Sequence, residues 1–148
     1  MSTPTYIADR PAPSLIYGLD AAGSLAFGIV LIAMAAPLTS LLGWSLPDAV
    51  LTAIGFGLLP WALFNLIIAS SARSVPRLVR ANIAGDLLWI VGSLALILFH
   101  AGELTTLGWV ALVAQALAVG VVMAVKIWGE RWLSGQLSAS LRQSSSAR

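Results

Sequence analysis

The chain of 148 residues contains no cysteine, a single histidine and few charged side chains. Without cysteine there is no disulfide framework, no thiolate metal site and no cysteine nucleophile. Charged residues make up 9% of the sequence, whereas soluble globular domains contain about 25%. The formal net charge is only +2, and we find no basic stripe of the kind that binds nucleic acid. These shortages exclude an ordinary soluble domain and a nucleic-acid partner.

Long apolar runs take the place of charge, and 59% of the residues are hydrophobic. A helix needs about 20 apolar residues to cross a bilayer core of about 30 Å. Four continuous runs meet this requirement, at positions 15–36, 49–69, 83–99 and 107–127. A membrane barrel would instead show strands of about 10 residues that alternate in and out. We therefore predict an all-α fold, a four-transmembrane-helix bundle with up-down topology.

The predicted domain organisation has three parts. A short N-terminal cytoplasmic segment (1–14) precedes the helical domain (15–133), and a polar, serine-rich tail (134–148) follows it. The first apolar run exceeds the 7–15 residues of a secretory leader, so we expect an anchor that is not cleaved. We expect the tail to be disordered because its composition is polar.

Positive charges are distributed unevenly among the connectors. The connectors 37–48 and 100–106 contain no Lys or Arg, whereas the middle connector carries Arg73, Arg77 and Arg80, and the C-terminal part carries Lys126, Arg131, Arg142 and Arg148. Basic loops remain on the cytoplasmic side. We therefore expect a bacterial inner-membrane protein with both termini in the cytoplasm. Arg73, Arg77 and Arg80 share one helical face; such a run either fixes orientation only or binds anionic lipid headgroups, at about 1 kcal/mol per charge.

Each span also contains a polar residue, although an ionisable group there costs about 2.5–3.5 kcal/mol. These residues are Asp20, Asn65, Asn82, Asp86 and Lys126. With alternating helix directions and a rise of about 1.5 Å per residue, Asp20, Asn65 and Asp86 all lie about 6–8 Å below the cytoplasmic boundary. The spacing of Asn82, Asp86, Trp89 and Ser93 places them on one face of the third span. We predict a single polar layer formed by Asp20, Asn65, Asn82, Asp86, Trp89 and Lys126.

This layer has two interpretations. In the first it is structural: Asp86 pairs with Lys126 or Arg80, and Asn65 forms an interhelical hydrogen bond worth about 0.6 kcal/mol. In the second it binds a proton, an ion or a small ligand, because two aspartates in one low-dielectric layer favour proton uptake. We identify no catalytic constellation, no metal site and no cofactor.

Two features at the opposite ends of the spans are local. Thr105 and Thr106 precede the fourth run and are suited to capping its helix, with Glu103 nearby. His100 ends the third run and has only Glu103 as a close partner in sequence. We expect a histidine exposed at a helix end rather than a metal ligand.

The second half of the chain resembles a known group of proteins. The stretch NIAGDLLWIVGS (82–93), followed by LTTLGWVALVAQALAV (104–119) and a basic C-terminal end, is similar to small four-helix bacterial inner-membrane proteins that have no assigned activity. The resemblance implies a fold and a location, and it implies neither an activity nor a cofactor.

The function expected from the sequence is non-enzymatic: an accessory or partner-binding four-helix bundle that joins a larger membrane complex or self-associates, since small residues allow close helix packing. The alternative is binding or translocation of a small solute or proton through the polar layer, as an oligomer. An enzyme acting on lipids is the third possibility, and it lacks a recognisable nucleophile–base pair.

Overall fold

The computed structural model describes residues 12–71 and 76–146, with side chains for 14–71 and 76–131. It contains five helices: α1 (Ala12–Ala33), α2 (Ala35–Leu42), α3 (Asp48–Ser70), α4 (Pro76–His100) and α5 (Thr106–Ser146). Segments of α1, α3, α4 and α5 are long and apolar enough to cross a membrane. This confirms the predicted helical class with four candidate spans and supports a multi-pass membrane protein.

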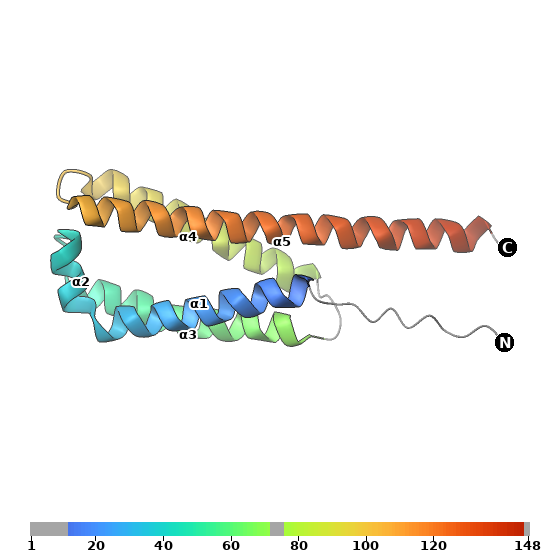
Figure 1. The fold of residues 1–148 in the computed structure, drawn as a ribbon, viewed down its shortest axis with the longest axis horizontal. Coiled ribbons are helices and arrows are strands. Elements are labelled where there is room, and N and C mark those ends of the chain that lie inside the picture. The colour runs from blue at the N-terminus through green and yellow to red at the C-terminus, as the bar shows by residue number, and fades with distance from the viewer. Residues whose placement is uncertain (1–11, 72–75, 147–148) are drawn as a thin grey trace.

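The four long helices form two pairs (Figure 1). α1 packs along α3, and α4 packs along α5. The long helices alternate in direction, and α2 lies across one end of the molecule. We call this the loop end, formed by α2 and residues 101–105. The opposite end holds Arg77, Arg80 and Arg131, and we call it the basic end.

The pairing of α1 with α3 depends on glycines where the two backbones meet. A Cβ atom at Gly55 would lie 2.7 Å from the carbonyl oxygen of Gly28 and 2.7 Å from Cγ1 of Ile32. A Cβ at Gly28 would lie 3.0 Å from the carbonyl oxygen of Gly55. Small residues at such a crossing let two helices approach closely without a side chain between them.

Helix α2 lies largely within the segment predicted as a plain connector. α1 ends at Ala33, three residues before the end of the predicted run, and α2 ends at Leu42, followed by Gly43 in the left-handed conformation (φ 70°). Leu38 and Leu42 are four residues apart and lie on one face of α2. Leu42 belongs to a buried apolar cluster with residues of α1 and α3, and Leu38 packs against that cluster. The helix therefore forms because its apolar face has a surface to cover.

Two other boundaries differ from the sequence prediction. α4 begins at Pro76 rather than at position 83, so Arg77 and Arg80 lie in its first turns. α5 continues to Ser146, whereas a disordered tail was expected for 134–148. From the residue before that tail, Leu133, Leu137 and Leu141 recur every fourth residue and no proline interrupts them, a spacing that suits a helix. Most of the predicted N-terminal segment (positions 1–11) and Arg73 and Arg148 lie outside the described residues.

Candidate functional site

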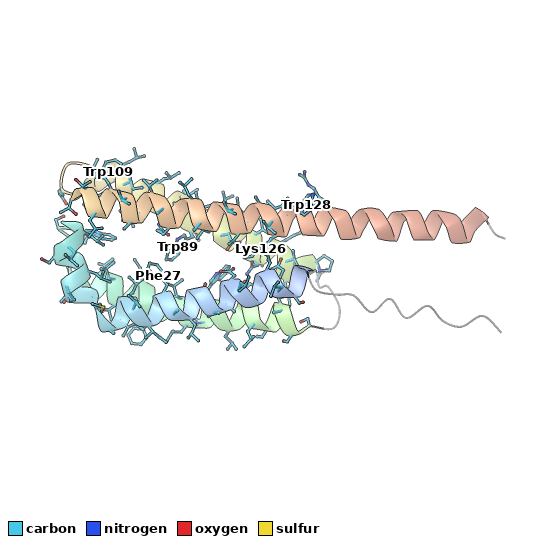
Figure 2. The ribbon with its side chains drawn as sticks, viewed as in Figure 1. Phe27, Trp89, Trp109, Lys126 and Trp128 are labelled. Atoms are coloured by element: carbon cyan, nitrogen blue, oxygen red, sulfur yellow. The ribbon has the colours of Figure 1, made fainter. Side chains whose placement is uncertain are left out.

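Lys126 of α5 lies at the centre of a buried polar cluster near the basic end (Figure 2). Its side chain has no exposed surface. The ammonium donates hydrogen bonds to Asp20 Oδ2 (2.5 Å), Asn82 Oδ1 (2.6 Å) and Asp86 Oδ2 (2.7 Å). An ammonium has three protons and no acceptor site. Every proton of Lys126 therefore has a partner, and none is left for another ligand.

Two asparagines extend the cluster to α3. Asn65 and Asn82 are completely buried. Asn82 Nδ2 donates to Asn65 Oδ1 (3.0 Å), and Asn65 Nδ2 donates to the carbonyl oxygen of Trp61 (3.2 Å). The orientation of the Asn82 amide follows from chemistry, because only its oxygen can accept from Lys126. Asp20, Asn65, Asn82, Asp86 and Lys126, which we call the Lys126 network, thus join α1, α3, α4 and α5.

Five of the six residues of the predicted polar layer, all except Trp89, form one connected hydrogen-bond network. The sequence placed Asp20, Asn65 and Asp86 at a common depth, and the structure brings all three together with Asn82 and Lys126. Of the two partners considered for Asp86, the structure shows Lys126 at 2.7 Å. Among the described residues Arg80 forms no ion pair.

The charges of the network are not balanced. Two carboxylates, Asp20 and Asp86, face one ammonium, so the cluster has one excess negative charge when all three groups are ionised. The side chain of Asp86 is 4% exposed and that of Asp20 is 16% exposed. Asp20 also accepts a hydrogen bond from Ser24 Oγ (3.2 Å). An uncompensated charge removed from water is costly, and binding one proton would remove the excess.

Tyr17 is a neighbour of the network that the sequence analysis missed. Its side chain is buried, and the centre of its ring lies 5.2 Å from Lys126 Nζ. At this distance the ring face attracts a cation. The spacing in the sequence could have identified this residue, because Tyr17 precedes Asp20 by three residues and therefore shares its helical face.

Trp89 belongs to a second group, farther along α4 toward the loop end. Its Nε1 donates to Gln115 Oε1 (2.5 Å), Gln115 Nε2 donates to Ser93 Oγ (2.7 Å), and Ser93 Oγ donates to the carbonyl oxygen of Trp89 (2.8 Å). Figure 2 shows Trp89 between the two helix pairs, apart from Lys126. The indole thus shares a helical face with Asp86, as predicted, but none of these bonds joins it to the network.

Polar contacts at the loop end fasten α2 to the connector before α5. The Oγ1 of Thr105 donates a hydrogen bond to the carbonyl oxygen of Leu41 (2.7 Å), and the backbone N–H of Thr105 donates to the carbonyl oxygen of Leu42 (3.0 Å). The same Oγ1 accepts from the N–H of Gly108 (3.0 Å), which confirms the predicted cap on α5 by Thr105.

Glu103 accepts a hydrogen bond from Ser45 Oγ (2.5 Å), and Nδ1 of His100, the last residue of α4, lies 3.1 Å from the same carboxylate oxygen. The bond from Ser45, together with the contact to His100, lowers the pKa of Glu103 below its ordinary value. His100 is therefore a local partner of Glu103 at the end of α4. Among the described residues no three His, Cys, Asp or Glu side chains gather to hold a metal ion.

Comparison with known proteins adds no assignment: no family model, no curated protein and no solved structure matches this chain. Function is therefore inferred from the geometry of the Lys126 network.

Proposed function

We propose that this protein is a non-enzymatic multi-pass membrane protein whose Lys126 network binds and releases one proton, and that the bound proton alters how firmly the two helix pairs are held together. The observation that supports this proposal is the fully buried ammonium of Lys126 between two aspartates from different helices, α1 and α4.

Charge imbalance favours a proton as the ligand. With both aspartates ionised the network has one excess negative charge, and an ionisable group inside a span costs about 2.5–3.5 kcal/mol on insertion scales. One proton neutralises the cluster and needs no additional space. An anionic solute would need a free donor, and all three protons of Lys126 are already engaged.

The two aspartates differ in their access to the surroundings, which suggests a route for the proton. Asp20 is the more exposed of the pair, at 16% against 4% for Asp86. We propose that the proton enters and leaves at Asp20. Because Lys126 contacts both carboxylates, a proton bound to one of them changes the charge around the other.

The network also joins the helix pairs. Lys126 of the α4–α5 pair reaches Asp20 of the α1–α3 pair, and Asn82 of α4 reaches Asn65 of α3. A change in the charge of Asp20 or Asp86 therefore acts on contacts between the pairs. This is the physical link between proton binding and the packing of the bundle.

Proton counting tests this proposal. The protein is reconstituted in lipid nanodiscs, and proton uptake after a downward pH step is read with a soluble indicator dye. We expect Asp86→Asn to take up about one proton fewer per chain than the wild type, because its network is already neutral when Asp20 is ionised and Lys126 charged.

The matched control is Asp48→Asn, which removes an exposed carboxyl in the first turn of α3, far from the network. We expect it to lose only the uptake of that one carboxyl group, while the uptake by the network stays as in the wild type. If Asp86→Asn takes up as many protons as the wild type while circular dichroism shows it folded, the proposal is wrong.

The accessory role expected from the sequence is a second candidate, and we place it in a bacterial inner membrane with both termini in the cytoplasm. Arg77, Arg80 and Arg131 at the basic end support this orientation. Open space next to Gly18, Gly23 and Gly92 supports close contact with helices of a partner or of a second copy. Co-purification of a stable partner in mild detergent would favour this candidate.

A further inference from the structure

The outer surface of the α4–α5 pair has an open groove at the basic end, with a volume of about 530 Å³. Its α4 wall includes Arg80, Ile83 and Leu87, and its α5 wall includes Met123, Ile127 and Arg131. This volume lies within the range of about 300–1,000 Å³ that is usual for small-molecule sites. The groove is separate from the Lys126 network, whose side chains are buried between the helices.

The groove is polar at one end and apolar at the other. Because α4 and α5 run in opposite directions (Figure 1), Arg80 and Arg131 lie at the same end. Leu87 is seven residues from Arg80, and Met123 is eight residues from Arg131. At a rise of about 1.5 Å per residue, both walls extend about 10–12 Å from the arginines into the apolar part of the span. An amphiphile with an anionic head fits this polarity.

The charge at the polar end favours an anion. Arg80 and Arg131 are exposed, and neither forms an ion pair among the described residues. Glu130 also lines this end, so two arginines and one glutamate give the rim a formal charge of +1. A guanidinium binds a phosphate through two parallel hydrogen bonds. Arg80 and Arg131, on adjacent helices, therefore supply donors of the kind that a phosphate accepts.

Trp128 indicates the depth of this polar end. It lies between Ile127 and Arg131 in sequence, its side chain is 72% exposed, and Figure 2 shows it pointing away from the bundle. Exposed indoles of membrane proteins lie at the level of the lipid headgroups. The arginine end of the groove is thus at headgroup level, and Leu87 and Met123 are at the level of the acyl chains.

We propose that this groove binds one anionic phospholipid, with its phosphate between Arg80 and Arg131 and an acyl chain along Ile83, Leu87 and Met123. The sequence grouped Arg73, Arg77 and Arg80 as possible headgroup ligands. The structure distinguishes two of them, because Arg80 lines the groove and Arg77, although exposed on the same helix, does not; Arg73 lies outside the described residues. The proposal does not depend on proton binding by the Lys126 network.

Native mass spectrometry of the delipidated protein in detergent tests this site. Phosphatidylglycerol and phosphatidylcholine with identical acyl chains are added in equal amounts, and the one-lipid adducts are compared. We expect the wild type to prefer phosphatidylglycerol. Arg80→Gln and Arg131→Gln should each weaken its binding about fivefold, and the double variant about 25-fold, since each charge contributes about 1 kcal/mol.

Two further arms distinguish this site from general attraction of anions. Arg77→Gln removes an equal charge from the same helix outside the groove and should leave the preference unchanged. Glycerol phosphate, which has the anionic head without acyl chains, should not displace the lipid. The proposal is wrong if the wild type shows no preference, if Arg77→Gln weakens binding as much as Arg80→Gln, or if glycerol phosphate competes at the concentration of the lipid.

Discussion

At the scale of single residues, the buried charge of Lys126 is compensated only by the side chains that accept its hydrogen bonds. It is fully buried, and its three acceptors come from α1 and α4. A buried ion pair often adds little compared with an apolar core, whereas removing one partner leaves a charge in a low-dielectric environment. The stability of the bundle should therefore respond more to the balance of the network than to the number of its bonds.

Replacing the ammonium tests this balance. Lys126→Met leaves two buried carboxylates without a cation, so we expect the free energy of unfolding to fall by about 3–5 kcal/mol. Unfolding in mixed micelles, followed by tryptophan fluorescence, measures the loss. The double variant Lys126→Met/Asp86→Asn should recover part of it because one charge has been removed. A double variant less stable than Lys126→Met would contradict this account of the network.

At the loop end, Glu103 predicts a dependence of stability on pH. Its pKa is lowered in the folded protein by the bond from Ser45, so its ionised form stabilises the fold. The contribution is complete above the ordinary pKa of about 4.3 and is lost as the pH falls through the lower, folded value. The stability difference between the wild type and Glu103→Gln should thus shrink on acidification. Thermal unfolding between pH 7 and pH 3 measures it, and a difference that grows in acid would refute this origin.

Sequence reasoning reached some of the site residues and missed others for physical reasons. Asp20, Asn65 and Asp86 could be brought together from helix direction and rise alone, because depth in a membrane follows from position along a span. The bond from Trp89 to Gln115 and the position of Tyr17 over Lys126 could not be predicted in this way. They depend on the rotation of each helix about its axis, which is set by packing.

At the scale of elements, the contact between α1 and α3 depends on backbone proximity. The carbonyl oxygens of Gly28 and Gly55 occupy positions where a side chain would otherwise lie. The hydropathy pattern identified both helices as spans but did not reveal this pairing, because the apolar residues surround each helix on all sides. The short helix α2 was missed for a related reason: it is stabilised by the buried cluster that contains Leu42, and such a cluster is not visible in a local sequence.

A methyl group at the crossing should separate the helices. In Gly55→Ala the new Cβ meets the backbone of Gly28, so we expect a loss of about 1–3 kcal/mol in the free energy of unfolding. Gly57→Ala is the matched control, since a Cβ at Gly57 meets nothing within 4 Å and alanine favours a helix by about 1 kcal/mol over glycine. Thermal unfolding in detergent compares the two. Equal effects of both substitutions would show that the crossing is not tightly packed.

At the scale of the whole molecule, polar contacts join the two helix pairs near the basic end and join the connector before α5 to α2 at the loop end. The Lys126 network makes the first connection, and Thr105 makes the second. Between these points Trp89 packs against the buried apolar cluster and donates a hydrogen bond to Gln115. The network therefore lies at the contact between the pairs, where we propose that a change of one charge acts.

The measurement that tests this account most directly is a pH titration of the carboxyl carbons of Asp20 and Asp86 by NMR in lipid nanodiscs, assigned with Asp20→Asn and Asp86→Asn. We predict that the two signals shift together as one proton is released per chain, while the backbone spectrum remains that of the folded bundle. If both carboxyl groups stay ionised at every pH at which the protein is folded, or if the two signals shift independently of each other, the Lys126 network is a structural clamp and not a proton site.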